Sequence, residues 1–245
     1  MENRCEVAPC GSFEVWARRS APLRLFMSEL STLLPILWGG FCTTLAIFAL
    51  TLLFSIPLGL LVAVLKMSRY RIIRYPVSFY ISVMRGTPLL LQIVAIYFGS
   101  YYLSEYAGVD FSFDRFPAVI VAFSINYAAY FAEIFRGGIQ SIPKGQYEAA
   151  YMLGLTRAQT FYRIILPQVV KRVVPASANE VITLVKDTSL AQVIAVTELF
   201  ALAKKQQAAY ASIYPLFVAG VFYYIANLLL SMFFAYVERK LNYYK

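Results

Sequence analysis

Long apolar runs alternate with short charged stretches along most of this 245-residue chain. A helix needs about 20 mostly apolar residues to cross the hydrocarbon core of a bilayer. Five segments meet or approach that length, and we predict a membrane-spanning helix in each. They are residues 33–65, 76–102, 117–135, 173–199 and 214–236.

Two of these segments are interrupted. In the second, Arg85, Gly86 and Pro88 predict a break, so residues 89–102 should make most of the crossing. The fourth is marginal by hydropathy because of its charged and amide side chains, but its length suits a span lined by protein. These side chains are Asn179, Glu180, Lys186, Asp187 and Glu198.

Basic residues fall mainly on one side of the predicted spans. With five spans, the loops at 66–74 and 136–172 and the tail after 236 share a side and hold most of the 22 Lys and Arg residues. The opposite loop, 103–116, has three acidic residues and one Arg. The positive-inside rule therefore places the C-terminus in the cytoplasm and the N-terminus outside.

Composition agrees with a membrane protein: 60% of residues are hydrophobic, the mean hydropathy is +0.63 and the net charge is +9. The charge follows the ends of apolar runs, which indicates an anionic membrane surface and no nucleic-acid partner. The chain has no His and three Cys, so we expect no metal site, no catalytic residues and no enzymatic activity.

The first 30 residues are polar and lack the apolar core of a signal peptide. We expect a mobile N-terminal extension over residues 1–30 and one membrane domain over residues 31–245. Cys5 and Cys10 in the extension are either free thiols, which we favour, or a disulfide if the extension is exported.

The predicted cytoplasmic loop at 141–167 is too patterned to be a simple connector. A short helix should begin after Pro143 and Gly145, and Ala149 and Ala150 give it a small surface suited to close docking. Gly154 should end it by adopting a left-handed conformation. A second amphipathic stretch follows and should end at Pro167; its apolar face is formed by Phe161, Ile164 and Ile165.

The spacing in this loop resembles the EAA loop of permease subunits of ABC importers: E-A-A, three residues, G, nine residues, I, one residue, L-P. In that family the loop is a coupling helix that docks on an ATP-hydrolysing subunit. The resemblance makes the following residues candidates for coupling: Glu148, Ala149, Ala150, Gly154, Arg157, Ile164, Leu166 and Pro167. An amphipathic helix lying on the membrane is the alternative.

Three further motifs resemble those of polar amino acid permeases: R-G-T-P at 85–88, E-x-x-R-G-G-I at 133–139 and K-D-T-S-L at 186–190. The resemblance covers roughly residues 33–240. It implies an all-α membrane protein with the type I ABC importer fold, five transmembrane helices and a cytoplasmic coupling helix. It also implies a bacterial cytoplasmic membrane.

The resemblance further implies uptake of a polar amino acid by alternating access, driven by a separate ATPase. The chain has no G-x-x-x-x-G-K-[ST] loop, so ATP and Mg²⁺ should bind the partner and no cofactor should bind this chain. The implied partners are an ATPase dimer, a second permease subunit, an extracytoplasmic solute-binding protein and membrane lipid. The alternatives are a stand-alone secondary transporter or channel, or a membrane enzyme.

Polar side chains in the predicted spans are candidates for the solute path. Glu180, Thr183 and Lys186 are three residues apart and should lie near one another on a helix. Together with their neighbours they offer donors for a carboxylate and acceptors for an ammonium group. The full set is Asn126, Glu180, Thr183, Lys186, Asp187, Thr188, Ser189 and Glu198. Lys186 and Asp187 could equally form a structural ion pair, and Glu133 should pair with Arg136 or Arg85.

Overall fold

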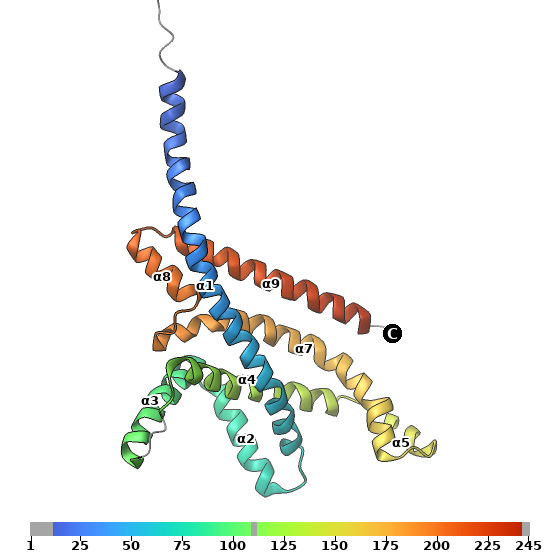
Figure 1. The fold of residues 1–245 in the computed structure, drawn as a ribbon. Coiled ribbons are helices and arrows are strands. Elements are labelled where there is room, and N and C mark those ends of the chain that lie inside the picture. The colour runs from blue at the N-terminus through green and yellow to red at the C-terminus, as the bar shows by residue number, and fades with distance from the viewer. Residues whose placement is uncertain (1–11, 109–111, 242–245) are drawn as a thin grey trace, which may run out of the picture.

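The computed structural model describes residues 12–108 and 112–241, with side chains from residue 30 onward. These residues form helices joined by short turns, with no strand among them (Figure 1). The predicted all-α fold is therefore confirmed. The helices are α1 (Ser12–Lys66), α2 (Arg71–Gly86), α3 (Leu89–Ala107), α4 (Arg115–Gln140), α5 (Lys144–Met152), α6 (Arg157–Thr160), the π-helix η1 (Phe161–Ile165), α7 (Leu166–Asp187), the 3₁₀-helix η2 (Thr188–Ile194), α8 (Leu199–Ala209) and α9 (Tyr214–Leu241).

Three of the described helices are long and apolar enough to cross a membrane alone: Leu30–Lys66 of α1, α4 and α9. The pair α2 and α3 could supply a fourth crossing, bent by 112°. The break predicted in this segment is thus confirmed, and Pro88 lies at it in an extended conformation. A count of five spans stays a prediction, because the remaining candidate, α7, is too polar to qualify by hydropathy.

Helix α1 is 55 residues long and continues without a break across residue 30. Its first turns project away from the other helices (Figure 1). The separate N-terminal extension stays a prediction, and Cys5 and Cys10 lie outside the described residues.

The prediction of one continuous helix over residues 173–199 is wrong. Helix α7 begins earlier, at Leu166, and ends at Asp187, where the chain tightens into η2. The hydroxyls of Thr188 and Ser189 donate to backbone oxygens three residues earlier, at 2.7 and 2.8 Å. Such local bonds compete with a continuing α-helix and favour the tighter turn. Helix α8 then starts separately and packs against α1 and α9.

Helix α4 is the most buried helix of the described bundle and packs against α1, α2, α3 and α7. Its contact with α1 is close because small residues of α1 face it at every fourth position. A Cβ at Gly59 would lie 2.8 Å from the Cβ of Phe131 and 3.1 Å from the backbone oxygen of Ala128. Close approach through small residues is the usual way in which helices pack inside a membrane. The buried small residues spaced by four along the second half of α1 are Thr51, Ser55, Gly59 and Ala63.

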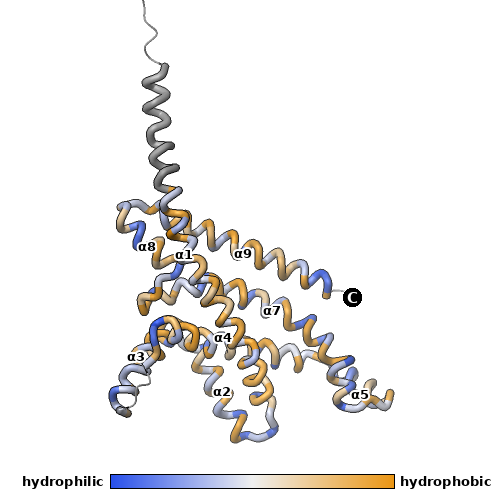
Figure 2. Tube along the Cα trace, viewed as in Figure 1, coloured by the Kyte–Doolittle hydropathy of each residue, from blue (hydrophilic) through white to orange (hydrophobic). Residues whose placement is uncertain are grey.

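Helix α9 lies along the outside of the bundle. Figure 2 shows it apolar over most of its length and hydrophilic at its C-terminal end. Only 6% of the residues in its most apolar stretch are buried within the chain. Because its large apolar side chains are exposed, this helix fits an apolar environment of lipid or of another subunit.

Candidate functional site

The loop between α4 and α7 begins with α5, which ends as the sequence predicts. Gly154 has a φ of +72°, in the left-handed region. The N–H of Leu155 donates to the oxygen of Ala150, and the N–H of Gly154 donates to that of Tyr151. This pair of bonds is a Schellman motif, which satisfies the carbonyl groups left open at a helix end. The glycine therefore fixes the direction in which the chain leaves α5.

The second half of the loop differs from the prediction. Thr156 caps α6 in a capping box with Gln159, a T-x-x-Q pattern that the sequence analysis missed. The chain then runs through η1 directly into α7. Pro167 does not end this segment, because it lies in the first turn of α7. A proline is tolerated there because the N–H that it lacks is not needed in a first turn.

The tip of the loop exposes a compact apolar surface. Tyr151, Met152 and Leu153 are 80%, 85% and 76% exposed, although all three are large and apolar. Figure 1 shows α5 at the ends of α4 and α7, away from the centre of the bundle. Clustered exposed apolar side chains mark interaction sites more often than scattered ones do.

The candidate coupling residues divide by burial. Ala150 is buried, and Ile164 and Leu166 are half-buried. Ile164 packs with the inner cluster of Ile142, Ile165, Val169 and Val173, which joins the loop to α7. The exposed candidates are Glu148, Ala149, Gly154, Arg157 and Pro167.

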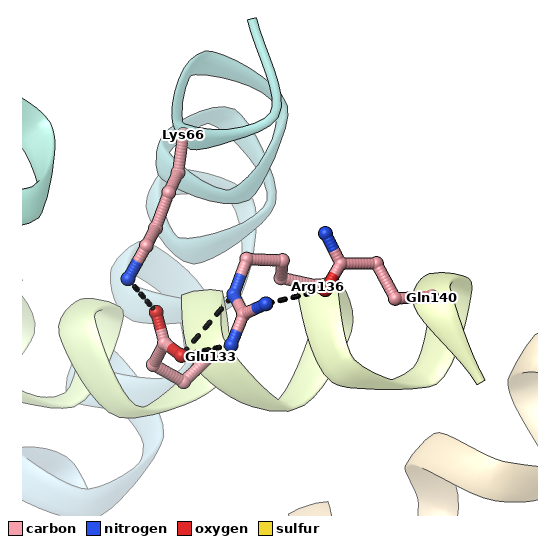
Figure 3. A network of polar contacts seen from close by, with 4 residues as sticks. All are labelled: Lys66, Glu133, Arg136 and Gln140. Carbon is pink, nitrogen blue, oxygen red and sulfur yellow. Dashed lines mark hydrogen bonds and ion pairs between the residues drawn. The ribbon is translucent and has the colours of Figure 1, made fainter. Parts of the chain in front are cut away.

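A polar network links α1 and α4 (Figure 3). Glu133 forms ion pairs with Lys66 at the end of α1 and with Arg136, whose Nη2 lies 2.6 Å from its carboxylate. Arg136 also donates to the side chain of Gln140. The predicted pairing of Glu133 with Arg136 is confirmed, and Lys66 is a second partner that the sequence did not indicate.

A cavity of about 130 Å³ lies where α4, α7 and the α2–α3 bend meet. Ligand pockets usually measure about 300–1,000 Å³, so this one suits a small solute or part of one. Its lining is polar and aromatic: Thr87, Leu89, Asn126, Tyr127, Tyr130, Glu180, Thr183 and Asp187.

Helical geometry explains how α7 contributes to this cavity. Glu180, Thr183 and Asp187 follow one another at intervals of three and four and share one face of the helix. Lys186 lies off that face and is exposed. The cavity lining therefore includes Glu180 and Thr183 of the predicted group, together with Asp187, but not Lys186; a role of Lys186 in the solute path stays a prediction. The structure records no ion pair between Lys186 and Asp187, although both are described.

The hydrogen-bond donors around the cavity are mostly engaged. The hydroxyl of Tyr127 donates to Asp187 at 2.7 Å, that of Thr183 to a backbone oxygen at 2.9 Å, and that of Thr87 to another at 2.8 Å. Two carboxylates remain as acceptors, Glu180 and Asp187. A cavity rich in acceptors favours a cationic group with several N–H donors, such as an ammonium.

Arg85 lies beside this cavity. Its guanidinium carbon is 5.2 Å from the centroid of the Tyr130 ring, and it interacts electrostatically with Glu180. A cation above an aromatic ring is held in place while its N–H groups remain available. Arg85 can therefore offer a positive charge close to Glu180.

Three other candidates lie outside the cavity lining. The hydroxyls of Thr188 and Ser189 are bonded to their own turn. Glu198 is fully buried, and its carboxylate accepts the N–H groups of Phe200 and Ala201, both at 2.7 Å. It also accepts the hydroxyl of Tyr223 at 3.0 Å. The geometry gives Glu198 the role of an N-terminal cap that ties α8 to α9.

Sequence reasoning missed four residues of the lining: Thr87, Leu89, Tyr127 and Tyr130. Thr87 belongs to the R-G-T-P motif at 85–88 and Leu89 directly follows it, but the sequence assigned no site to this motif. Tyr130 lies four residues after Asn126 and three after Tyr127, and this helical spacing was the signal available. The contact of Tyr127 with α7 joins residues 60 positions apart, and spacing along the chain does not predict it.

Residues 55–243 match the profile of a family described as the binding-protein-dependent transport system inner membrane component. The chain is 40% identical to the L-cystine transport system permease protein TcyB of Bacillus subtilis over 212 residues, which are 86% of this chain and 88% of that protein. It is 39% identical to the arginine transport system permease protein ArtQ of the same species, over 85% of this chain and 94% of that protein.

The fold also matches solved structures. One, described as an amino acid ABC transporter with histidines, superposes with a TM-score of 0.78 at 34% identity, over 88% of this chain and 98% of that chain. The MetNI methionine ABC transporter in an inward-facing conformation superposes with a TM-score of 0.63 at 18% identity, over 88% of this chain and 98% of that chain, which shows a shared fold.

Proposed function

The chain belongs to the family of inner membrane components of binding-protein-dependent transport systems, and we propose that it forms the path by which a polar amino acid enters the cell. It is a transport permease subunit and not an enzyme in itself. Its relatives are subunits of transport systems, so the stand-alone transporter gains no support from them. The coupling loop at 141–167 serves a motor subunit, and the cavity beside α7 serves the solute.

The observation that carries this proposal is the position of α7 between the two sites. Its first turn continues the coupling loop, and its last turns supply Glu180, Thr183 and Asp187 to the cavity. A force on the loop can reach the solute through a single helix, which continues past Pro175. A helix that joins two sites is one of the elements that can carry energetic coupling between them.

The solute binds through its ammonium group. The two carboxylates of the cavity accept the ammonium N–H groups, and Arg85 attracts the carboxylate of the same amino acid. This arrangement is compatible with the arginine and L-cystine named for the relatives ArtQ and TcyB. The side chain of the solute extends from the cavity and is selected elsewhere.

The motor is an ATPase pair whose subunits hold ATP and Mg²⁺. Each ATPase subunit binds the exposed tip of α5 from one permease subunit on the cytoplasmic side. A second permease subunit completes the path, and an extracytoplasmic solute-binding protein delivers the amino acid. The chain crosses the bacterial cytoplasmic membrane five times, with its N-terminus outside and its C-terminus in the cytoplasm, as the charge distribution favours.

Reconstitution tests the proposal. The permease, its partner ATPase and the solute-binding protein are placed in liposomes, and uptake of labelled L-arginine, L-cystine and L-glutamine is measured. We expect uptake of at least one of them, dependent on ATP and on all three components. Uptake without the ATPase, or none of the three amino acids transported, would contradict the proposal.

Replacing one carboxylate tests the cavity. D187N keeps the shape of the side chain but removes its charge, so uptake should fall at least about tenfold because a charged hydrogen bond to the solute is lost. The adjacent K186Q also removes one charge, yet it should retain most of the uptake because Lys186 faces away. An equal loss of uptake in D187N and K186Q would show that the cavity is not part of the solute path.

A further inference from the structure

Gln92, one turn into α3, is a buried polar side chain with no assigned role. It is 9% exposed. Its Nε2 donates to the backbone oxygens of Met84 at 3.0 Å and Thr87 at 3.2 Å, and lies 2.8 Å from the hydroxyl oxygen of Thr87. These backbone oxygens belong to the last turn of α2 and to the bend that follows it. Gln92 therefore donates hydrogen bonds to carbonyl groups that have no helical partner because the helix is broken there.

The orientation of the Gln92 amide follows from these neighbours. A nitrogen beside two carbonyl oxygens must be the donor, so the other end of the amide must be the oxygen. That oxygen lies 2.9 Å from the Nδ2 of Asn126 in α4. Asn126 must then present its NH₂ group to Gln92, and this NH₂ group also donates to Met84 at 3.0 Å.

Asn126 lines the solute cavity, whereas Gln92 does not. Both N–H groups of the Asn126 amide have acceptors in the protein, and the structure records no partner for its oxygen among the described residues. The amide therefore has an acceptor left and no donor. Without Gln92, only the bond to Met84 would hold the Asn126 amide in this orientation, and one of its N–H groups would be left without a partner.

We propose that Gln92 is a positioning residue for the solute cavity: it braces the α2–α3 bend and fixes the amide of Asn126 with its oxygen as the group left for a solute. This inference rests on the proposed function, because it assigns the role to the same cavity. It adds a third oriented acceptor to the carboxylates of Glu180 and Asp187. It also gives a reason for the burial of a polar side chain near the start of α3.

Two substitutions separate the two tasks of Gln92. Q92M keeps the length of the side chain but loses both the donor and the acceptor. Q92E keeps an oxygen that can accept from Asn126 but loses the N–H groups that bond Met84 and Thr87. S100A is the matched control, since Ser100 is also buried and hydrogen-bonded in α3 but lies away from the cavity.

The experiment uses the purified permease–ATPase complex and measures two quantities for each variant. The first is the Kd of the complex for L-arginine, L-cystine and L-glutamine, each compared with its N-acetyl derivative, which lacks the ammonium charge. The second is hydrogen exchange of the backbone amides of residues 87–92, which needs no solute. Q92M should weaken binding roughly 3- to 10-fold and accelerate exchange. Q92E should accelerate exchange but weaken binding less, and S100A should change neither quantity.

A double-mutant cycle shows whether Gln92 acts through Asn126. In an N126A background, Q92M should cause little further loss of binding, because the amide that it orients is gone. Equal losses in both backgrounds, equal binding losses for Q92E and Q92M, or an unchanged Kd in Q92M would overturn the inference while leaving the proposed function in place. If the wild-type complex binds none of the three free amino acids, the proposed function fails, and the inference fails with it.

Discussion

Two adjacent glycines near the end of α4 have different surroundings. A Cβ on Gly138 would lie 2.3 Å from the Cγ2 of Val173, so α4 and α7 approach one another through this position. A Cβ on Gly137 would meet nothing within 4 Å. The packing of α4 against α7 therefore requires a glycine at position 138 but not at position 137.

We predict opposite effects of alanine at these two glycines. G138A should lower the free energy of unfolding by about 1–3 kcal/mol because α4 and α7 must separate to admit the methyl group. G137A should be neutral or stabilising by up to about 1 kcal/mol because alanine favours the helix. Thermal unfolding of the purified complex compares the two, and equal stability would show that α4 and α7 are not closely packed there.

At the level of single residues, the sequence supports some roles but not others. The turn at Gly154 and the pairing of Glu133 with Arg136 are local, so spacing predicts them. The contacts of Lys66 with Glu133, and of Gln92 with Asn126, join separate helices and depend on how the helices pack. Such partners are not visible in a pattern along one helix.

At the scale of elements, the tip of α5 is an apolar surface made by one short helix and the turn that ends it. Its position is set by the Schellman motif behind it and by the apolar cluster that anchors the loop to α7. The long apolar helices and this loop could be predicted from the sequence because each has a local signal. The early end of α7 could not, because Ser and Thr hydroxyls also bond to the backbone inside continuing helices, as Thr183 does, so Thr188 and Ser189 alone do not predict an end.

We predict that M152E breaks the contact with the ATPase. A charge placed on this surface would be buried without a partner, and association should weaken at least about tenfold. Y106E is the control, because Tyr106 is similarly exposed, at 93%, but lies at the far end of α3. Co-purification of the ATPase measures both, and a normal yield with M152E would exclude this tip from the interface.

At the scale of the whole molecule, two surfaces differ in kind. The outer face of α9 is apolar over most of its length, whereas the ends of the bundle carry charged residues and short loops (Figure 2). Hydropathy along the chain could predict this division. It could not predict the cavity, which exists only where three segments of the chain are brought together.

Labelling from each side of the membrane tests the predicted orientation. The three native cysteines are first replaced, and a single cysteine is introduced at exposed Lys144 or exposed Glu105. A reagent that cannot cross the membrane should label E105C in intact cells and K144C only after the cells are opened, because α5 is predicted to be cytoplasmic. The reverse pattern would invert the orientation and exclude α5 from contact with a cytoplasmic ATPase.

The uninterrupted course of α7 also limits how this chain can change in length. Each residue of an α-helix turns the following residues by about 100° and advances them by about 1.5 Å. An insertion or deletion of one residue between Gln168 and Ala178 would therefore swing Glu180 and Asp187 out of register with Tyr127, although neither residue had been altered. Variation in length should fall instead in the turn between α8 and α9, where no such register has to be kept.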